Sequence, residues 1–235
     1  MILASGKGGT GKTSVTAGLG CALALRGRRC LLIDADAGMQ SLDLALGVYR
    51  DAAFDYTDVA NGAIALSDAA VPVEEIPDVR VLAAPADAGL AGPDTLEKLV
   101  RACCAAGEYD YILIDAPAGV GRGFEAAAAA ARSGVVVATA DPICLRSAEK
   151  CAEKLRACGV GNIRLIVNRV RRDFMRRGLP NIDDAIDATG VRLLGYVPED
   201  ETVSLCGAEG VPVLRYPRRR ASRAFSEIAD RLLGE

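Results

Sequence analysis

The residues best placed to do chemistry lie near the start of the chain, where Gly6–Thr13 reads GKGGTGKT. This stretch fits the phosphate-binding pattern G-x-x-x-x-G-K-[S/T] and carries a second lysine, Lys7, inside the loop. In such a loop the glycines let backbone N–H groups face phosphate oxygens, Lys12 supplies positive charge, and Thr13 offers a hydroxyl to Mg²⁺. A helix expected over Ser14–Arg26 would point the positive end of its dipole at the phosphates. The chain is therefore predicted to bind a nucleoside triphosphate.

Polar residues follow three apolar runs that are typical of buried strands. Asp34 and Asp36 follow the first run, Asp115 the second and Asn168 the third. An aspartate at a strand end beside a phosphate loop is a typical place for a carboxylate that acts on Mg²⁺ or on the attacking water. For one isolated aspartate, capping of the next helix or turn is an equally good interpretation. Because three such strand ends accompany one phosphate loop, we favour a functional site.

Strand-like runs alternate with helical patterns along nearly the whole chain. The expected strands are Ile2–Ala4, Cys30–Asp34, Val79–Ala84, Tyr109–Asp115, Gly134–Thr139, Ile163–Asn168 and Leu193–Val197. The expected helices are Ser14–Arg26, Pro93–Ala106, Phe124–Arg132, Leu145–Cys158 and Ile182–Thr189. Continuous apolar strands predict a three-layer, doubly wound α/β fold, in which helices cover both faces of a mainly parallel sheet and ligand binds at the strands' C-terminal ends. No low-complexity linker divides the chain, so residues 1–235 are expected to form a single domain.

The composition excludes several classes of function. The chain has no histidine, which excludes Ser-His-Asp catalysis, histidine metal ligation and histidine pH switching within it. A net charge of −3 argues against gross electrostatic attraction to nucleic acid. No apolar run approaches the length of a membrane span, and the first strand begins at once, without a basic and then apolar signal segment. We therefore expect a cytoplasmic protein.

The 8 cysteines do not form a recognisable metal or disulfide pattern, because no C-x-x-C occurs. Cys144, Cys151 and Cys158 recur at the same interval on one expected helix, so neighbours lie about 10 Å apart along its axis. That separation is too large for two of them to share an ion. We interpret them as a buried apolar stripe with free thiols.

The motifs around the phosphate loop resemble those of the MinD/ParA family of ATPases. The segment Lys7–Thr13 (KGGTGKT) resembles the deviant Walker A sequence of that family. The segment Leu31–Gly47 (LLIDADAGMQSLDLALG) resembles its switch I, and Tyr111–Val120 (YILIDAPAGV) resembles its switch II. The later segments Leu179–Ile186 and Gly195–Val213 resemble the MinD branch in particular. The resemblance covers almost the whole chain and implies a P-loop NTPase fold.

This resemblance implies a role for each matching residue. Lys7 matches the signature lysine that reaches across a dimer interface to the phosphates of the other subunit. Asp36 matches the carboxylate that orients the attacking water, so the implied catalytic residues are Lys7, Lys12 and Asp36. The implied metal-shell residues are Thr13, Asp34 and Asp115. The implied nucleotide-binding residues, which include an adenine-reading asparagine and the other wall of the base pocket, are Lys7, Gly8, Gly9, Thr10, Gly11, Lys12, Thr13, Ser14, Asn168, Arg169, Pro198, Glu199 and Asp200.

The family resemblance further implies a slow, Mg²⁺-dependent ATPase that binds ATP and ADP and forms a homodimer with ATP. Phosphoryl transfer to water needs in-line placement and charge neutralisation more than a strong base. A lysine donated by a partner subunit would act as an arginine finger does. The expected role is control of the spatial placement of the division machinery, with division regulators as partners that stimulate hydrolysis.

The end of the chain departs from the MinD branch, whose members usually continue into a linker and a basic amphipathic helix that binds membrane. This chain stops at Glu235, so that anchor is expected to be absent from it. The final helix carries Phe225, Ile228, Ala229 and Leu232 on one face, which we interpret as a stripe that docks on the sheet. A membrane-surface helix, with a peripheral location at the inner face of the membrane, is the alternative.

Other functions on the same fold remain as alternatives. A ParA-like partition ATPase would bind DNA nonspecifically as an ATP dimer, although we regard DNA as an unfavoured partner. The arginines available for such phosphate contacts are Arg169, Arg171, Arg172, Arg176 and Arg177. A metallocofactor-loading ATPase commonly needs paired cysteines, so the lack of C-x-x-C disfavours it. A biosynthetic amidotransferase or ligase is the least favoured, because no substrate domain remains beside the nucleotide-binding core.

Overall fold

The computed structural model describes residues 1–37, 39–171 and 181–234. Within these ranges one sheet has the strand order β3-β4-β2-β5-β1-β6-β7-β8. The strands are β1 Ile2–Ala4, β2 Cys30–Asp34, β3 Val71–Val73, β4 Ile76–Leu82, β5 Tyr111–Asp115, β6 Gly134–Ala138, β7 Ile163–Val170 and β8 Leu193–Pro198. Neighbouring strands pair in parallel except for the antiparallel β3 and β4. The mainly parallel sheet predicted from the sequence is confirmed.

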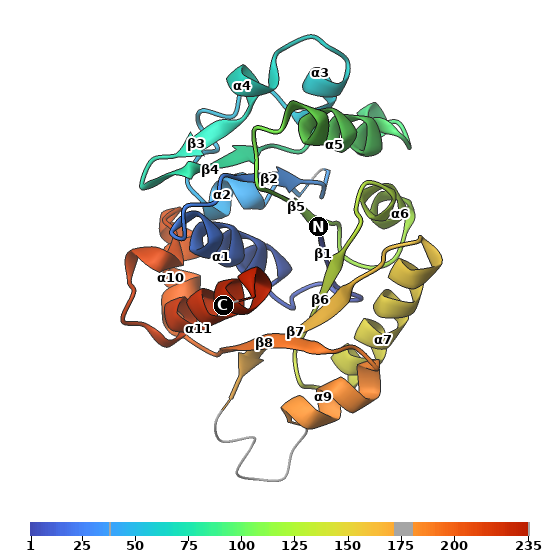
Figure 1. The fold of residues 1–235 in the computed structure, drawn as a ribbon, viewed down its shortest axis with the longest axis vertical. Coiled ribbons are helices and arrows are strands. Elements are labelled where there is room, and N and C mark those ends of the chain that lie inside the picture. The colour runs from blue at the N-terminus through green and yellow to red at the C-terminus, as the bar shows by residue number, and fades with distance from the viewer. Residues whose placement is uncertain (38, 172–180, 235) are drawn as a thin grey trace.

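Helices cover both faces of this sheet (Figure 1). On one face lie α1 Lys12–Ala24, α2 Leu42–Ala45, α10 Glu201–Glu209 and α11 Arg220–Leu233. On the other lie α3 Tyr56–Ala60, α4 Leu66–Ala69, α5 Thr95–Ala106, α6 Arg122–Ala129, α7 Pro142–Ala157 and α9 Ile182–Thr189. Two short 3₁₀ helices, η1 Ala88–Leu90 and η2 Val213–Arg215, complete the described elements. The predicted three-layer architecture is therefore confirmed.

Alternate residues of the central strands belong to two separate cores. In β1, Ile2 and Ala4 face the core beneath α5, α6 and α7, whereas Leu3 faces the core beneath α1 and α11. Along β2, Ile33 faces the core beneath α5, α6 and α7, and Leu32 faces the core beneath α1 and α11. Because both faces of the sheet are covered, the central strands β1, β2, β5 and β6 are apolar up to their last residues. This is the physical reason for the continuous apolar runs in the sequence.

Several elements differ from the sequence predictions. Strand β3 was not expected, because Pro72 cannot donate a ladder hydrogen bond and therefore argues against a strand in the sequence. The structure places β3 at the edge of the sheet, where proline is tolerated. Helix α10 was also not expected, because β-branched Thr202 and Val203 and the mid-helix Gly207 have low helix propensity. Strand β7 continues to Val170 and does not end at Asn168.

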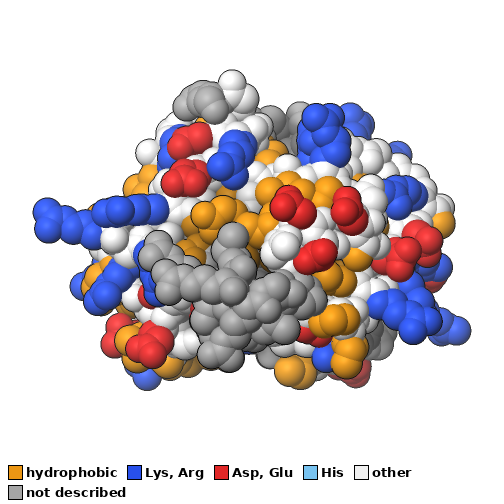
Figure 2. Space-filling view, turned by 90° about the horizontal axis from the view of Figure 1, so that it is seen from below, with side chains coloured by type: hydrophobic (Ala, Val, Ile, Leu, Met, Phe, Trp, Pro, Cys, Tyr) orange, Lys and Arg blue, Asp and Glu red, His pale blue; other side chains and the backbone are white. Residues whose placement is uncertain are grey.

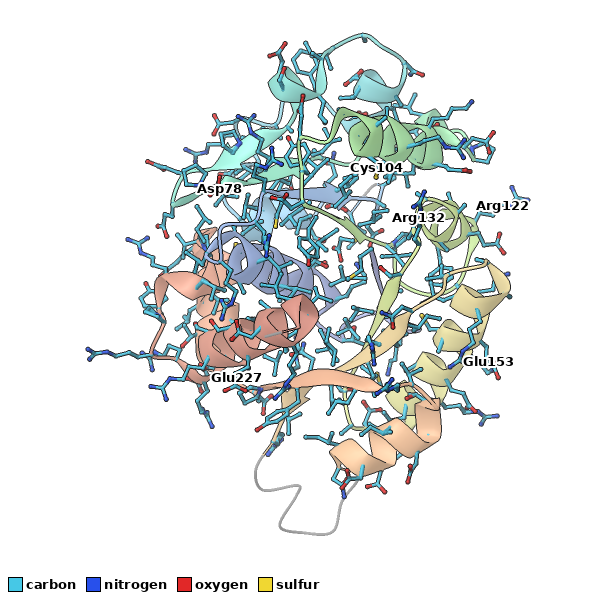
Figure 3. All side chains as sticks on the ribbon, in the orientation of Figure 1. Asp78, Cys104, Arg122, Arg132, Glu153 and Glu227 are labelled. Carbon is cyan, nitrogen blue, oxygen red and sulfur yellow. The ribbon has the colours of Figure 1, made fainter. Side chains whose placement is uncertain are left out.

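The final helix, α11, docks on the molecule through its apolar face, as predicted. It packs against α1 and β8, with Phe225, Ile228 and Ala229 buried. The Phe225 ring lies so close to α1 that a Cβ built on Gly18 would be 2.5 Å from a ring carbon. Glu227 projects from the opposite, exposed face of α11 (Figure 3). None of the described helices has the length and apolar character needed to cross a membrane.

The cysteines behave largely as predicted. Cys144 and Cys151 are buried on α7, and Cys158 is half-buried at its C-cap. All cysteines are free thiols, and Cys104 on α5 is exposed (Figure 3). Burial raises the pKa of Cys151 to about 12, so this thiol is held in its unreactive protonated form.

Candidate functional site

The predicted phosphate loop connects β1 directly to α1. Gly9 and Gly11 have φ values of 82° and 83°, a left-handed conformation that glycine adopts without strain. Helix α1 begins at Lys12, with no side-chain cap at Gly11 and no acidic residue in its first turn. The backbone N–H groups at this helix end are therefore left for an anion, with the helix dipole favouring negative charge.

A buried cluster joins the start of α1 to the end of β5. Lys12 Nζ lies 2.7 Å from Asp115 Oδ1, and Thr13 Oγ1 donates to Asp115 Oδ2 at 2.7 Å. Thr16 Oγ1 donates to the same carboxylate at 2.8 Å. Asp115 is 0% exposed and Lys12 is 6% exposed, so the pair is shielded from water. The fold thus brings together the residues predicted to contact phosphate and metal.

Asp34 ends β2 directly beside Asp115, because the two residues are Cα partners in the parallel ladder. Its Oδ2 accepts hydrogen bonds from the backbone N–H groups of Ser41 at 2.9 Å and Leu42 at 3.0 Å. Its Oδ1 accepts from the N–H of Asp36 at 2.9 Å. The chain that follows β2 is therefore folded around this carboxylate.

Burial and, next, the negative charge of Asp115 raise the pKa of Asp34 to about 6. Its backbone hydrogen bonds and the charge of Lys12 oppose this rise without cancelling it. A bound cation would favour the ionised form, because it would offset the repulsion between the two carboxylates. Thr13, Asp34 and Asp115 offer only oxygen donors, which is the chemistry that Mg²⁺ prefers.

No group of His, Cys, Asp or Glu within the described ranges is arranged to hold a metal ion by itself. Mg²⁺ commonly keeps several waters and shares its ligands between protein oxygens and substrate phosphates. The oxygen donors of Thr13, Asp34 and Asp115 fit a metal that arrives with a nucleotide.

Two residues of the segment after β2 face the loop and β5. Ser41 Oγ lies 3.2 Å from Thr13 Oγ1, and either hydroxyl can be the donor. The half-buried Asp36 carboxylate lies near the backbone of Ala118, just after β5, and this backbone group favours the ionised form of Asp36. Burial raises the pKa of Asp36, Lys12 opposes this rise, and Asp115 adds to it. The segments that follow β2 and β5 thus meet beside the phosphate loop.

Lys7 lies apart from this buried cluster, on an exposed part of the loop. Its charge acts on Asp141, at the start of α7. Burial alone would raise the pKa of Asp141, but hydrogen bonds from Thr139 and Cys144, together with Lys7, lower it below its usual value. Lys7 is therefore accessible at the surface of the molecule.

A cleft of about 790 Å³ lies beside the phosphate loop. Predicted nucleotide-binding residues from three parts of the chain line it, namely Gly11, Ser14, Asn168, Arg169, Pro198, Glu199 and Asp200. Arg219 and Arg220, at the start of α11, also line the cleft. The sequence analysis did not assign these two arginines to the site, because no local motif places the start of α11 beside β7.

Asn168 links the cleft to the phosphate loop. Its Nδ2 donates to the backbone oxygen of Thr10 at 2.8 Å, and the side chain is buried. The β7–β8 pairing is irregular between Val167 and Val170, and Arg169 has a φ of 53°. A Cβ on Gly11 would lie 2.3 Å from Asn168 Nδ2, so this contact requires glycine.

The local sequence contains signals for two missed residues of the site. Thr16 follows Lys12 by one helical turn, which places both on the same face of α1. Ser41 lies within Leu31–Gly47, the segment that resembles switch I.

Among the described residues, Thr10 Oγ1 is the buried side-chain N or O atom without a hydrogen-bond partner.

Two of the five arginines considered for DNA contacts belong to the described residues. Arg169 and Arg171 are described, whereas Arg172, Arg176 and Arg177 lie outside the described residues. Arg171 forms an ion pair with Glu199, with 3.7 Å between Nε and Oε2. On the face shown in Figure 2, the described basic and acidic side chains are interspersed.

Comparison with known proteins gives consistent matches along the chain. The profile of the CobQ/CobB/MinD/ParA nucleotide binding domain matches residues 1–213. The septum site-determining protein MinD of Bacillus subtilis is 34% identical over 240 residues, covering 100% of this chain and 89% of that protein.

Solved structures agree with these sequence matches. The MinC:MinD cell division protein complex of Aquifex aeolicus matches with a TM-score of 0.92 and 33% identity, covering 100% of this chain and 95% of that one. MinD of Pyrococcus horikoshii, complexed with Mg-ADP, matches with a TM-score of 0.88 and 32% identity, covering 98% and 94%. A ParA family ATPase of Chlorobium tepidum is 22% identical with a TM-score of 0.78, a likeness of fold alone.

Proposed function

Because this chain belongs to the CobQ/CobB/MinD/ParA family of nucleotide-binding domains, we propose that it is a MinD-like ATPase that dimerises on ATP. Hydrolysis of ATP would control the spatial placement of the division machinery. The observation that carries this proposal is the buried contact of Lys12 and Thr13 with Asp115, each at 2.7 Å. Similarity to septum-site proteins along the whole chain supports the division role.

In this proposal the chain acts on the triphosphate by positioning and charge, because phosphoryl transfer to water needs these more than a strong base. The N–H groups at the start of α1 bind phosphate oxygens, and Lys12 neutralises their charge. Thr13, Asp34 and Asp115 would hold Mg²⁺, directly or through water. When bound, Mg²⁺ supplies further neutralisation of the phosphate oxygens. Asp36 orients the attacking water in line with the phosphorus.

The base cleft is proposed to select adenine through Asn168. Its Nδ2 is already engaged with the Thr10 carbonyl, so the Oδ1 acceptor is left for the base. At C6 of the purine ring adenine presents an amino group to such an acceptor, whereas guanine presents at the same position a carbonyl oxygen that cannot donate. The walls of the cleft would be Ser14 and Arg169 on one side and Pro198–Asp200 on the other.

The proposed dimer depends on the exposed Lys7, which would contact the triphosphate of the partner subunit. Each lysine gains a charge-assisted contact only when ATP lies across the interface, so ATP and dimerisation favour each other. A division regulator would bind this ATP dimer and stimulate hydrolysis, since the Aquifex relative was solved as a MinC:MinD complex. A cytoplasmic or membrane-peripheral location stays a prediction.

The test is the mass of the Asp36→Ala protein in ATP and in ADP, measured by sedimentation together with phosphate release. We expect ATP to stay bound without turnover, with a dimer in ATP and a monomer in ADP. Adding Lys7→Ala should weaken the dimer while the monomer stays folded, because an exposed lysine buries little surface. Equal mass in the two nucleotides would overturn the dimer switch, and normal turnover would remove Asp36 from the mechanism.

The same protein tests the alternative functions. A gel shift of DNA that appears only with ATP and weakens with salt would favour a partition ATPase. Copurification of a metal cluster or nickel would favour a metallocofactor-loading ATPase. We expect neither outcome for a septum-site protein.

A further inference from the structure

One carboxylate, that of Asp200, is bonded to the starts of two helices. Oδ1 accepts a hydrogen bond from the N–H of Thr202 at 3.0 Å, which makes Asp200 the N-cap of α10. Oδ2 accepts from the N–H of Ala221, in the first turn of α11, at 3.2 Å. Helix α11 has no side-chain cap of its own at Arg219 and no acidic residue in its first turn. Asp200 therefore supplies the anion that both helix ends need.

The charges around Asp200 strengthen this arrangement. Burial alone would raise its pKa, but hydrogen bonds from Ala221 and Thr202, followed by the charge of Arg220, lower it below its usual value. Arginines at Arg218–Arg220 precede and begin α11, where positive charge is unfavourable beside the helix dipole. An ionised Asp200 offsets that repulsion.

The same contacts hold one wall of the cleft. Arg220 Nη2 donates to the backbone oxygen of Glu199 at 3.3 Å, next to Asp200 in the chain. Pro198, Glu199 and Asp200 all line the cleft beside Asn168. This wall is thus tied to α11 through Asp200 and through Arg220. Any turn of the Asp200 carboxylate toward a ligand would release at least one helix end.

We propose that Asp200 is a positioning residue, which joins α10 to α11 and so holds the Pro198–Asp200 wall against the nucleoside part of the ligand. This inference rests on the proposed nucleotide site and assigns Asp200 no direct contact with the nucleotide. It also couples two events: a nucleoside that fills the cleft stabilises the docking of α11, and a firmly docked α11 improves nucleoside binding.

The experiment compares Mg-ADP with Mg-pyrophosphate in the Asp200→Ser variant by calorimetry. Serine is a good N-cap for α10, but its side chain is too short to reach Ala221 as well. We expect ADP affinity to fall about tenfold, as for the loss of one charged cap contact. Pyrophosphate affinity should not change, because this ligand occupies only the phosphate loop. Amide exchange at Ala221 should speed up, and ADP should protect it less.

The matched control is Asp55→Ser, which changes the N-cap of α3, a helix that does not line the cleft. It should lower the thermal midpoint comparably and leave ADP affinity unchanged. Unchanged ADP affinity in Asp200→Ser would overturn the positioning role, and so would an equal loss for ADP and pyrophosphate. If the unaltered protein binds neither ligand, the proposed nucleotide site itself is wrong, and this role is overturned with it.

Discussion

The side-chain amide of Asn168 is tied to the backbone oxygen of Thr10 at 2.8 Å, although the two residues are 158 positions apart in the chain. This bond connects the irregular end of β7 to the phosphate loop. Both partners are buried, so the bond is shielded from competing water. The loop for phosphate and the cleft proposed for the base are therefore held as one unit.

Asn168→Asp should weaken ADP binding, because the carboxylate has the size of the amide but cannot donate to the Thr10 oxygen. Loss of the bond and repulsion between the two oxygens should cost about 1–3 kcal/mol of binding free energy. Calorimetry with Mg-ADP measures this cost. Asn162→Asp is the control, because it makes the same charge change at an exposed residue beside β7. An equal loss of affinity in the two variants would contradict a specific role for Asn168.

Lys12→Met should abolish nucleotide binding and also destabilise the protein, because Asp115 would remain buried without its cation. Breaking a buried ion pair in this way costs about 3–5 kcal/mol. The double variant Lys12→Met with Asp115→Asn should recover much of the stability and none of the binding. Urea unfolding and calorimetry separate the two effects. Full ADP affinity in Lys12→Met would refute the phosphate site.

The raised pKa of Asp34 predicts two pH effects in opposite directions. Without ligand, its contribution to stability is fully present below the unfolded pKa of 3.8 and is lost as pH rises through about 6. The loss is on the order of 3 kcal/mol for this group alone. Mg-ADP, which favours the ionised carboxylate, should bind more weakly below pH of about 6 and release a proton there.

Calorimetry at that pH in two buffers of different ionisation enthalpy measures the released proton. Asp34→Asn should remove the proton release, because the amide does not titrate. Binding without proton release in the unaltered protein would show that Asp34 does not respond to the ligand.

Phe225→Ala should destabilise the protein by about 3–5 kcal/mol, because the ring is 1% exposed and packs against α1. Thermal or urea unfolding measures the loss. Glu227→Ala is the control on the exposed face of the same helix and should change stability little. A small effect of Phe225→Ala would mean that α11 does not need to dock for the fold to form.

Local pattern alone determined the main elements and the centre of the candidate site. The run from Gly6 to Thr13 predicts the phosphate loop, because glycine, lysine and threonine at this spacing each have a defined role in phosphate or Mg²⁺ binding. Asp34, Asp115 and Asn168 could be placed together because parallel strands bring their carboxyl ends to one edge. Strands such as β3, which contains Pro72, escaped prediction because their local composition resembles a loop.

Only the tertiary structure decided which groups meet across the chain. No local sequence pattern predicts three of these meetings. Ser41 lies beside Thr13, Arg219 and Arg220 line the cleft, and Asp200 bonds to the start of α11 as well as that of α10. Their meeting depends on strand order and on how α10 and α11 pack over the sheet. Periodicity and motif spacing describe which residues share one helix or strand. They do not describe which distant elements become neighbours, because burial of the two cores selects that arrangement.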